Sequence, residues 1–244
     1  WPGPLTLILP RAPHVHDVVT GGQDTVGIRV PSHPVAQSLL RAFGGGVAAP
    51  SANRFGRISP TTAQHVTEDL GNRVDLVLDG GACPVGIEST IVACVGDTPM
   101  LLRPGGIGIE ALTRVLGRAP AAAHRDAPRA SGTLASHYAP RTPARLVDAS
   151  ELAKVLRERG DARVGVLARR VPRPLDFNGT WISAPEPAQV YAHDLYANLR
   201  ALDHAGVANI LIESVPDEAA WLAVRDRLAR ATHGAADDAI DDID

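Results

Sequence analysis

The sequence predicts an α/β protein with two domains, and three features of its 244 residues support this prediction. In residues 1–118, short apolar runs end at Pro or Gly and few helical patterns separate them, which is typical of a twisted mixed sheet with helices packed against it. Residues 119–142 are rich in Ala and Pro and show no apolar period, as linkers do. From residue 143, strand and helix patterns alternate, which predicts a small parallel α/β domain.

The elements of the first domain are predicted from apolar runs and the residues that interrupt them. Pro34 can begin a helix because its missing N–H is not needed in the first turn, and three glycines after Phe43 end it. Ser59 is predicted to cap a second helix, with Pro60 in its first turn. The expected helices are 34–43, 60–70 and 109–116. The expected strands are 5–9, 25–30, 47–49 and 76–79, with a hairpin of 91–95 and 99–103, and 14–24 is expected to be a loop.

The second domain has the regular alternation of a parallel sheet. The expected strands are 145–147, 164–168, 181–183 and 209–215. The expected helices are 150–159, 188–205 and 218–231, the first of them capped by Ser150. This domain contains neither a GxGxxG nor a GxxxxGK motif, so no nucleotide site is predicted in it. Residues 235–244 are acidic and are expected to form a disordered tail.

Composition excludes several classes of function. The net charge is −3, and residues 1–118 hold nine Arg and nine acidic residues, so the basic patch of nucleic-acid-binding proteins is not indicated and stable nucleic-acid binding is not expected. The chain has no apolar run of membrane-spanning length and no secretion signal, so no membrane partner is expected. Cys83 and Cys94 lack metal-ligand spacing. They could form a disulfide, but two small buried residues in a reducing cytosol are the preferred interpretation, which predicts a cytoplasmic protein.

The most informative stretch reads Gly-x-Glu-Ser-Thr and is followed by alternating apolar residues. It places Glu88, Ser89 and Thr90 where a loop enters a β-branched strand, so that polar groups lie at the edge of a core and can contact a ligand. Hydroxyls that bond only to the backbone of their own turn are the alternative. Taken alone, the motif is better explained by that alternative.

A second loop, Ala49-Pro50-Ser51-Ala52-Asn53, also combines small and polar residues. Ser51 offers a hydroxyl, Asn53 offers an amide with both donor and acceptor, and the alanines let a ligand approach the backbone. An ordinary Ser/Asn turn is the alternative here.

Four further strings accompany these loops in a fixed order. They are residues 1–6 (WPGPLT), 25–31 (TVGIRVP), 102–105 (LRPG) and 136–140 (SHYAP). Together the six strings resemble the threonylcarbamoyl-AMP synthase family in its two-domain form. The resemblance implies a YrdC-like catalytic domain over 1–118, a linker over 119–142 that folds over the active site, a Rossmann-like α/β domain over 143–234 and a tail over 235–244.

The resemblance implies an activity. In this family L-threonine, bicarbonate and ATP are joined into threonylcarbamoyl-AMP with release of pyrophosphate, for the N6-threonylcarbamoyladenosine modification at position 37 of tRNA. The implied cofactor is Mg²⁺, which arrives with ATP. The implied partner is the tRNA threonylcarbamoyl transferase machinery that consumes the product. No catalytic residue and no protein metal ligand are implied, because positioning and electrostatics carry the reaction.

The resemblance also implies a set of site residues. A guanidinium fork suits the carboxylate of threonine, which is the physical reason for including an arginine in the threonine site. Threonine is expected at Arg29, Ala49 and Ser89, ATP at Thr25, Ser51, Ser59, Arg103 and Tyr138, and supporting roles at Asn53, Glu88 and Thr90.

Each of the more specific assignments has a structural alternative. Arg29 could be a surface arginine whose stem covers apolar neighbours. Arg103 could cap the helix that follows it. Glu88 could brace its loop through backbone N–H groups. Tyr138 could pack against the second domain instead of closing over the nucleotide.

Two functional alternatives remain. The chain begins with Trp1 inside a motif that is internal in the family, and the family's Lys-x-Arg element does not occur, so the N-terminal segment of the family is expected to be missing. A non-catalytic module that binds nucleotide or RNA is therefore one alternative. A carbamoyl-transfer enzyme related to hydrogenase maturation is the other, although the acylphosphatase and zinc-finger modules of those enzymes have no counterpart here.

Overall fold

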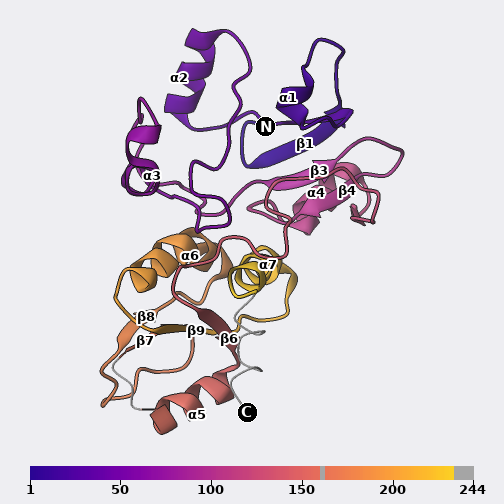
Figure 1. Ribbon diagram of the computed structural model, residues 1–244. Helices are drawn as coiled ribbons and strands as arrows, with labels where there is room; N and C mark the ends of the chain where they lie inside the picture. The colour runs from indigo at the N-terminus through magenta and orange to yellow at the C-terminus, as the bar shows by residue number, and fades with distance from the viewer. Residues whose placement is uncertain (160–162, 234–244) are drawn as a thin grey trace, which may run out of the picture. The chain divides into compact units, whose positions relative to one another are not determined.

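The computed structural model describes residues 1–159 and 163–233, and the chain divides into two compact units (Figure 1). Unit 1 comprises residues 1–50, 78–81 and 87–133, and unit 2 comprises residues 51–77, 82–86 and the chain from Leu134 onward. The division falls between Gly86 and Ile87, inside the Gly-x-Glu-Ser-Thr motif. Each unit is therefore described separately.

Unit 1 is built on a five-stranded mixed sheet in the order β2-β1-β3-β4-β5. The strands are β1 (Leu5–Pro10), β2 (Thr25–Ile28), β3 (Thr90–Ala93), β4 (Met100–Arg103) and β5 (Ala121–Ala122). The pairs β1–β2 and β3–β4 are antiparallel, whereas β1–β3 and β4–β5 are parallel. All four residues of the central strand β3 are buried, so the sheet places the start of β3 at the edge of the core. The predicted mixed sheet and the predicted hairpin are confirmed.

Three helices belong to unit 1: α1 (Asp17–Thr20), α2 (Pro34–Phe43) and α4 (Ile109–Leu116). Helices α2 and α4 have the predicted bounds, because proline and glycine mark their ends locally. Helix α1 lies inside the predicted loop, since four residues are too few to show a helical period. No residue of α2 is buried, and its apolar residues Leu39 and Phe43 are exposed.

Unit 2 contains a four-stranded sheet in the order β6-β9-β7-β8, and all of its strand pairs are parallel. The strands are β6 (Ala144–Val147), β7 (Val164–Ala168), β8 (Thr180–Ser183) and β9 (Asn209–Glu213). The helices of this α/β part are α5 (Ala149–Arg159), α6 (Ala188–Asp203) and α7 (Leu222–Ala231), with a 3₁₀ turn at Ala219–Trp221. Figure 1 shows α5 on one face of the sheet and α6 and α7 on the other. The predicted parallel α/β domain is confirmed.

Apolar side chains cover both faces of this sheet. Every residue of β7 is buried, as expected for a parallel strand between two helical layers. Leu152 and Leu156 of α5 pack in one cluster with Val166. Leu199 and Leu202 of α6 are fully buried. Helix α6 is thereby held firmly against the sheet, which matters below for the arginine that it carries.

The remaining helix, α3 (Ala63–Leu70), belongs to unit 2 and continues into a 3₁₀ turn at Gly71–Arg73. Its N-cap is Thr62, whose hydroxyl accepts a hydrogen bond from the His65 N–H, so the prediction that Ser59 is the cap is wrong. Similarly, the carboxylate of Asp148 accepts the Glu151 N–H at the start of α5, where Ser150 was predicted to be the cap. In both cases the competing side chain lies two or three residues away, and only the backbone path selects between them.

Two predicted strands are wrong. Residues 47–49 and 76–79 form no strand, and Val47, Leu76 and Leu78 are exposed. A short apolar run becomes a strand only where another strand can pair with it, and sequence does not report that partner. Cys83 is exposed and Cys94 half-buried, and the two form no disulfide, so the prediction of two buried cysteines is wrong for Cys83.

Helices long and apolar enough to cross a membrane do not occur in the parts of the chain that the structure describes. The predicted acidic tail, residues 235–244, lies outside the described residues. Residues 119–133 of the predicted linker belong to unit 1 and residues 134–142 to unit 2. The predicted domain limits themselves stay a prediction.

Candidate active site

In unit 1, Ser89 is the centre of a buried polar cluster at the start of β3. Its hydroxyl lies 2.7 Å from the hydroxyl of Thr6 on β1. The guanidinium of Arg103 at the end of β4 donates to the Ser89 carbonyl from Nη2 (2.9 Å) and Nε (3.2 Å), and Nη2 also lies 3.3 Å from the Ser89 hydroxyl. Arg103 Nη1 donates to the carbonyl of Ser131 at 2.9 Å. Strands β1, β3 and β4 are neighbours in the sheet. Thr6 of β1, Ser89 just before β3 and Arg103 of β4 therefore meet at the same point of the sheet.

The next residue, Thr90, connects the same loop to the turn before α4. Its hydroxyl donates to the Ile107 carbonyl and accepts from the Ile107 N–H, at 2.9 and 3.0 Å. Gly105 lies so close to this loop that a Cβ there would come within 2.4 Å of the Thr90 nitrogen. The turn around Gly105 thus packs backbone against backbone on the Glu88–Thr90 loop, which is possible only with glycine at this position.

The other predicted site residues of unit 1 lie in more open positions. Thr25 is half-buried at the first position of β2, and Ala49 is exposed in an irregular segment. Glu88 is half-buried. Arg29 is exposed just after β2, and its guanidinium has no ion-pair or hydrogen-bond partner among residues 1–159 and 163–233. Arg29 is therefore available to a carboxylate, whereas Arg103 is engaged with the backbone of the Ser89 loop.

In unit 2, the segment 51–59 holds three further predicted site residues. Ser51 is exposed, and Ser59 is buried. Asn53 donates from Nδ2 to the Arg57 carbonyl at 2.7 Å, so its amide closes the loop on itself. Its Oδ1 atom is buried and accepts no hydrogen bond from any described residue. A buried acceptor without a donor is costly, which marks this oxygen as a possible ligand contact.

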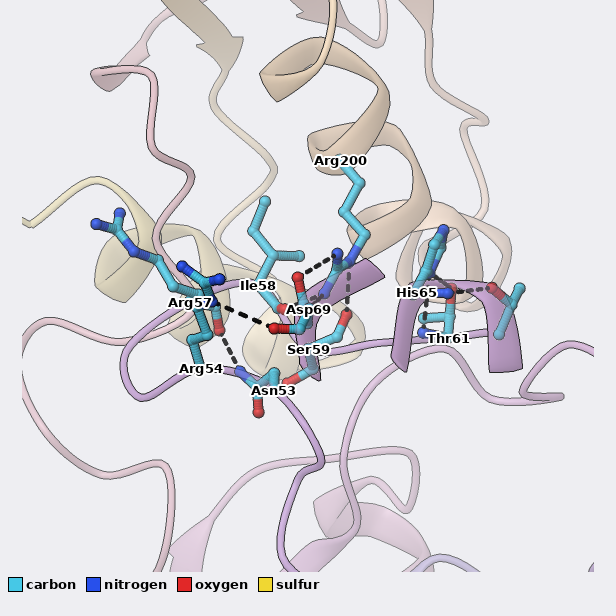
Figure 2. A network of polar contacts seen from close by, with 10 residues as sticks. Asn53, Arg54, Arg57, Ile58, Ser59, Thr61, His65, Asp69 and Arg200 are labelled. Carbon is cyan, nitrogen blue, oxygen red and sulfur yellow. Dashed lines mark hydrogen bonds and ion pairs between the residues drawn. The ribbon is translucent and has the colours of Figure 1, made fainter. Parts of the chain in front are cut away.

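A buried arginine of α6 holds the far end of this segment (Figure 2). Arg200 donates to the Ile58 carbonyl at 2.6 Å and to the Ser59 carbonyl at 3.4 Å. It also forms an ion pair with Asp69 of α3 at 2.5 Å. Sequence analysis missed Arg200, because an arginine beside buried leucines on a long helix carries no local functional signal.

Tyr138 is buried in unit 2, where it is 1% exposed. Its ring stacks on Tyr196 of α6 at a centroid distance of 5.6 Å, and the guanidinium of Arg227 lies over it at 5.2 Å. In this conformation the tyrosine packs against the second domain, which was one of the two interpretations of the motif. Its contact with a nucleotide stays a prediction.

Backbone strain occurs in both of the predicted ATP-binding segments of unit 2. Ala52 has φ 53° and Tyr138 has φ 63°, and they are the non-glycine residues with positive φ in the described parts of the chain. Each such residue costs about 1–3 kcal/mol and persists only where its surroundings enforce it, which occurs most often at ligand sites.

Comparisons with known proteins show which family this chain belongs to. The family model described as "Telomere recombination" (Sua5, YciO and YrdC) matches residues 1–105, and the model of the threonylcarbamoyl-AMP synthase C-terminal domain matches residues 107–233. Threonylcarbamoyl-AMP synthase of Bacillus subtilis is 39% identical over 246 residues, which cover 96% of this chain and 71% of that protein. The chain belongs to the threonylcarbamoyl-AMP synthase family.

Other members of the threonylcarbamoyl-AMP synthase family are also similar to this chain. The synthase of Pyrococcus abyssi is 36% identical over 95% of this chain and 71% of its own length. The crystal structure of P. abyssi Sua5 complexed with L-threonine superposes with a TM-score of 0.82 at 35% identity, over 95% of this chain and 71% of that one. A variant of the same protein, in which an adjacent histidine and tyrosine are replaced by alanine, has a TM-score of 0.83 at 34% identity.

The structure brings some of the predicted synthase residues into contact. Ser89 and Arg103 are in direct contact, and they are joined by Thr6, which was noted only as part of a string. The signal for Thr6 was its place in the apolar run that becomes β1, and this alone does not distinguish it from any other strand threonine. The remaining residues divide between the units: Thr25, Arg29, Ala49, Glu88 and Thr90 in unit 1, and Ser51, Asn53, Ser59 and Tyr138 in unit 2.

Proposed function

We propose that this chain forms threonylcarbamoyl-AMP and pyrophosphate from L-threonine, bicarbonate and ATP. The observation that carries the proposal is the similarity to named synthases along 95–96% of the chain. A structure of one of these relatives holds L-threonine. The product would supply the threonylcarbamoyl group for N6-threonylcarbamoyladenosine in tRNA, in the cytoplasm, through a separate transferase.

Unit 1 supplies the groups that we assign to threonine. Arg29 is exposed and unpaired among the described residues, so its fork of N–H donors can take the threonine carboxylate in a bidentate pair. Ser89 offers a buried hydroxyl whose position is set by Thr6 and Arg103. We assign Arg103 to the ATP site as well, where its contact with Ser89 would connect the two substrates.

Unit 2 supplies a second group of contacts, which we assign to ATP. Ser51 and Ser59 offer hydroxyls, and Tyr138 would close on the nucleotide. We assign Mg²⁺ to the phosphates of ATP, where it would neutralise their charge. The described residues contain no cluster of three acidic, His or Cys side chains that could hold a metal alone. The unpartnered Asn53 Oδ1 is an oxygen of the kind that Mg²⁺ accepts, so the chain fits a metal held mainly by substrate.

The chemistry requires no covalent protein intermediate. The threonine amine attacks the carbon of bicarbonate, and water leaves to give the carbamate. A carbamate oxygen then attacks the α-phosphorus of ATP, and the bond to the bridging oxygen breaks to release pyrophosphate. The protein would accelerate both steps by holding the reactants in line and by stabilising the charge that develops on the phosphates.

The first test is pyrophosphate release from ATP by this chain, with threonine and bicarbonate each present or omitted. We expect release only when both are present, together with a threonylcarbamoyl-AMP peak by mass spectrometry. The Bacillus subtilis relative serves as the positive control. Pyrophosphate release that does not depend on threonine would contradict the proposal. So would the absence of release under conditions where the relative is active, and that result would favour a nucleotide-binding module without turnover.

A further inference from the structure

Arg200 is a charged residue in a position where charge is expensive. Its side chain is 7% exposed, and it belongs to a helix whose neighbours Leu199 and Leu202 are fully buried. A buried guanidinium must find acceptors for its N–H groups, since an unpaired charge in this environment would destabilise the fold strongly. Arg200 therefore requires hydrogen-bond acceptors close to its guanidinium.

The acceptors come from one short stretch of unit 2, as Figure 2 shows. Two are the main-chain carbonyls of Ile58 and Ser59, at 2.6 and 3.4 Å. The other two are both carboxylate oxygens of Asp69, at 3.3 and 2.5 Å. Four acceptors around one planar cation match the fork of an arginine, and the compact ammonium of a lysine cannot reach them all.

Further hydrogen bonds to backbone carbonyls hold the same stretch. Arg54 Nε donates to the Asp69 carbonyl at 3.2 Å, and Asn53 Nδ2 bonds the Arg57 carbonyl. Arg57 Nη1 donates to the Pro140 carbonyl at 3.1 Å, and residue 57 forms an isolated bridge with Ala139. These outer contacts are made by exposed or half-buried side chains, whereas the contacts of Arg200 with the two carbonyls are buried and keep more of their strength.

We propose that Arg200 is a positioning residue for ATP: by holding the Ile58 and Ser59 carbonyls and Asp69, it fixes the segment 53–59, which carries Ser59, one of the residues assigned to ATP. The C-terminal α/β domain thereby contributes to nucleotide binding without touching the nucleotide. This inference rests on the proposed function, because the contact of Ser59 with ATP belongs to it.

The test compares Arg200→Gln with Arg200→Lys and Asp69→Asn in the full chain. For Arg200→Gln we expect KM for ATP to rise about tenfold or more, and KM for threonine to change less than about twofold, since a small displacement of a binding loop weakens one substrate selectively. Arg200→Lys should recover only part of the loss. Asp69→Asn should have a smaller effect, because Arg200 keeps both carbonyls.

Glu213→Ala is the matched control for loss of stability. Glu213 is buried in the same domain and accepts the backbone N–H groups of Arg169, Arg170 and Val171, and among the described residues no hydrogen bond or ion pair joins it to segment 53–59. This variant should lower the melting temperature and leave KM for ATP unchanged well below that temperature. An equal rise of KM for ATP in both variants would overturn the positioning role.

A second readout does not depend on activity. Hydrogen exchange of peptides covering residues 53–62 should be faster in Arg200→Gln than in the wild type and in Glu213→Ala, whereas peptides of β7 should be unaffected by Arg200→Gln. If the wild type makes no threonylcarbamoyl-AMP, the proposed function fails, and unchanged exchange in segment 53–62 would separately show that Arg200 does not order it.

Discussion

At the scale of single residues, the main result is that the predicted site residues differ in what they are free to do. Arg29 and Ser51 are exposed, so a ligand can reach them. Ser89 and Arg103 are buried and hydrogen-bonded to each other, so they hold the shape of the candidate site in the absence of a ligand. Residue type and motif position predict both kinds equally, and only the packing separates them.

Tyr138 can be tested by two substitutions with different consequences. Tyr138→Ala removes a ring that is 1% exposed and stacked on Tyr196, so we expect a loss of about 3–5 kcal/mol in the free energy of unfolding. Tyr138→Phe keeps the ring and removes the hydroxyl. If the tyrosine closes on ATP through that hydroxyl, Tyr138→Phe should weaken ATP binding in calorimetry. Unchanged ATP affinity in both variants would mean that the ring only packs.

His65 is expected to make the stability of the protein depend on pH. Burial lowers the pKa of His65 below its ordinary value, and the charge of Arg200 and, to a smaller extent, His204 act in the same direction, against Glu68 and Asp69. Its Nδ1 lies 3.2 Å from the Thr61 nitrogen and accepts that N–H, so the ring is neutral when this bond is made.

Because the folded pKa lies below the unfolded one, the stability from neutral His65 is present above the unfolded pKa and is lost as the pH falls through the folded pKa. We expect unfolding measurements to show weaker stability below about pH 6 than at pH 7.5, and we expect His65→Gln to reduce this difference. An imidazole titration by NMR with a pKa at or above its ordinary value would contradict the assignment.

At the scale of elements, the ends of helices were predicted best where a backbone requirement marks them. Proline at the start of α2 and glycine after its end act within the local chain, so the predicted bounds agree with the structure. Strands 47–49 and 76–79 were wrong because pairing is not local. The caps of α3 and α5 were each displaced, although the residue types chosen were suitable.

The cap of α5 provides a prediction at this scale. The hydrogen bonds from the Ser150 hydroxyl and the Glu151 N–H lower the pKa of Asp148. Its contribution to stability is therefore present above the unfolded pKa and is lost as the pH falls through the folded one. Asp148→Ala should lower the melting temperature at pH 7, and Asp148→Asn should restore most of it, since an amide oxygen can also cap. Ser150→Ala, the predicted cap, should have the smaller effect; the reverse order would contradict the assignment.

At the scale of the whole molecule, the family and the α/β class could be derived from the sequence, because both rest on short motifs and on the order of apolar runs. The division into units could not. The segment 51–77 clusters with the C-terminal part of the chain, although it lies between strands of the first sheet in sequence. Contacts such as Arg200 with Ile58 join residues 142 positions apart, and no local pattern reports them.

The sequence alone therefore determined the elements whose signals are local, the motifs that belong to threonylcarbamoyl-AMP synthases and the residue types at the candidate site. The tertiary structure decided which of these side chains are buried and what they contact: Ser89 with Thr6 and Arg103, Tyr138 with Tyr196. The physical reason is that turn, cap and period act within a few residues of the chain. Burial and the partners of a buried charge depend on segments that only folding brings together.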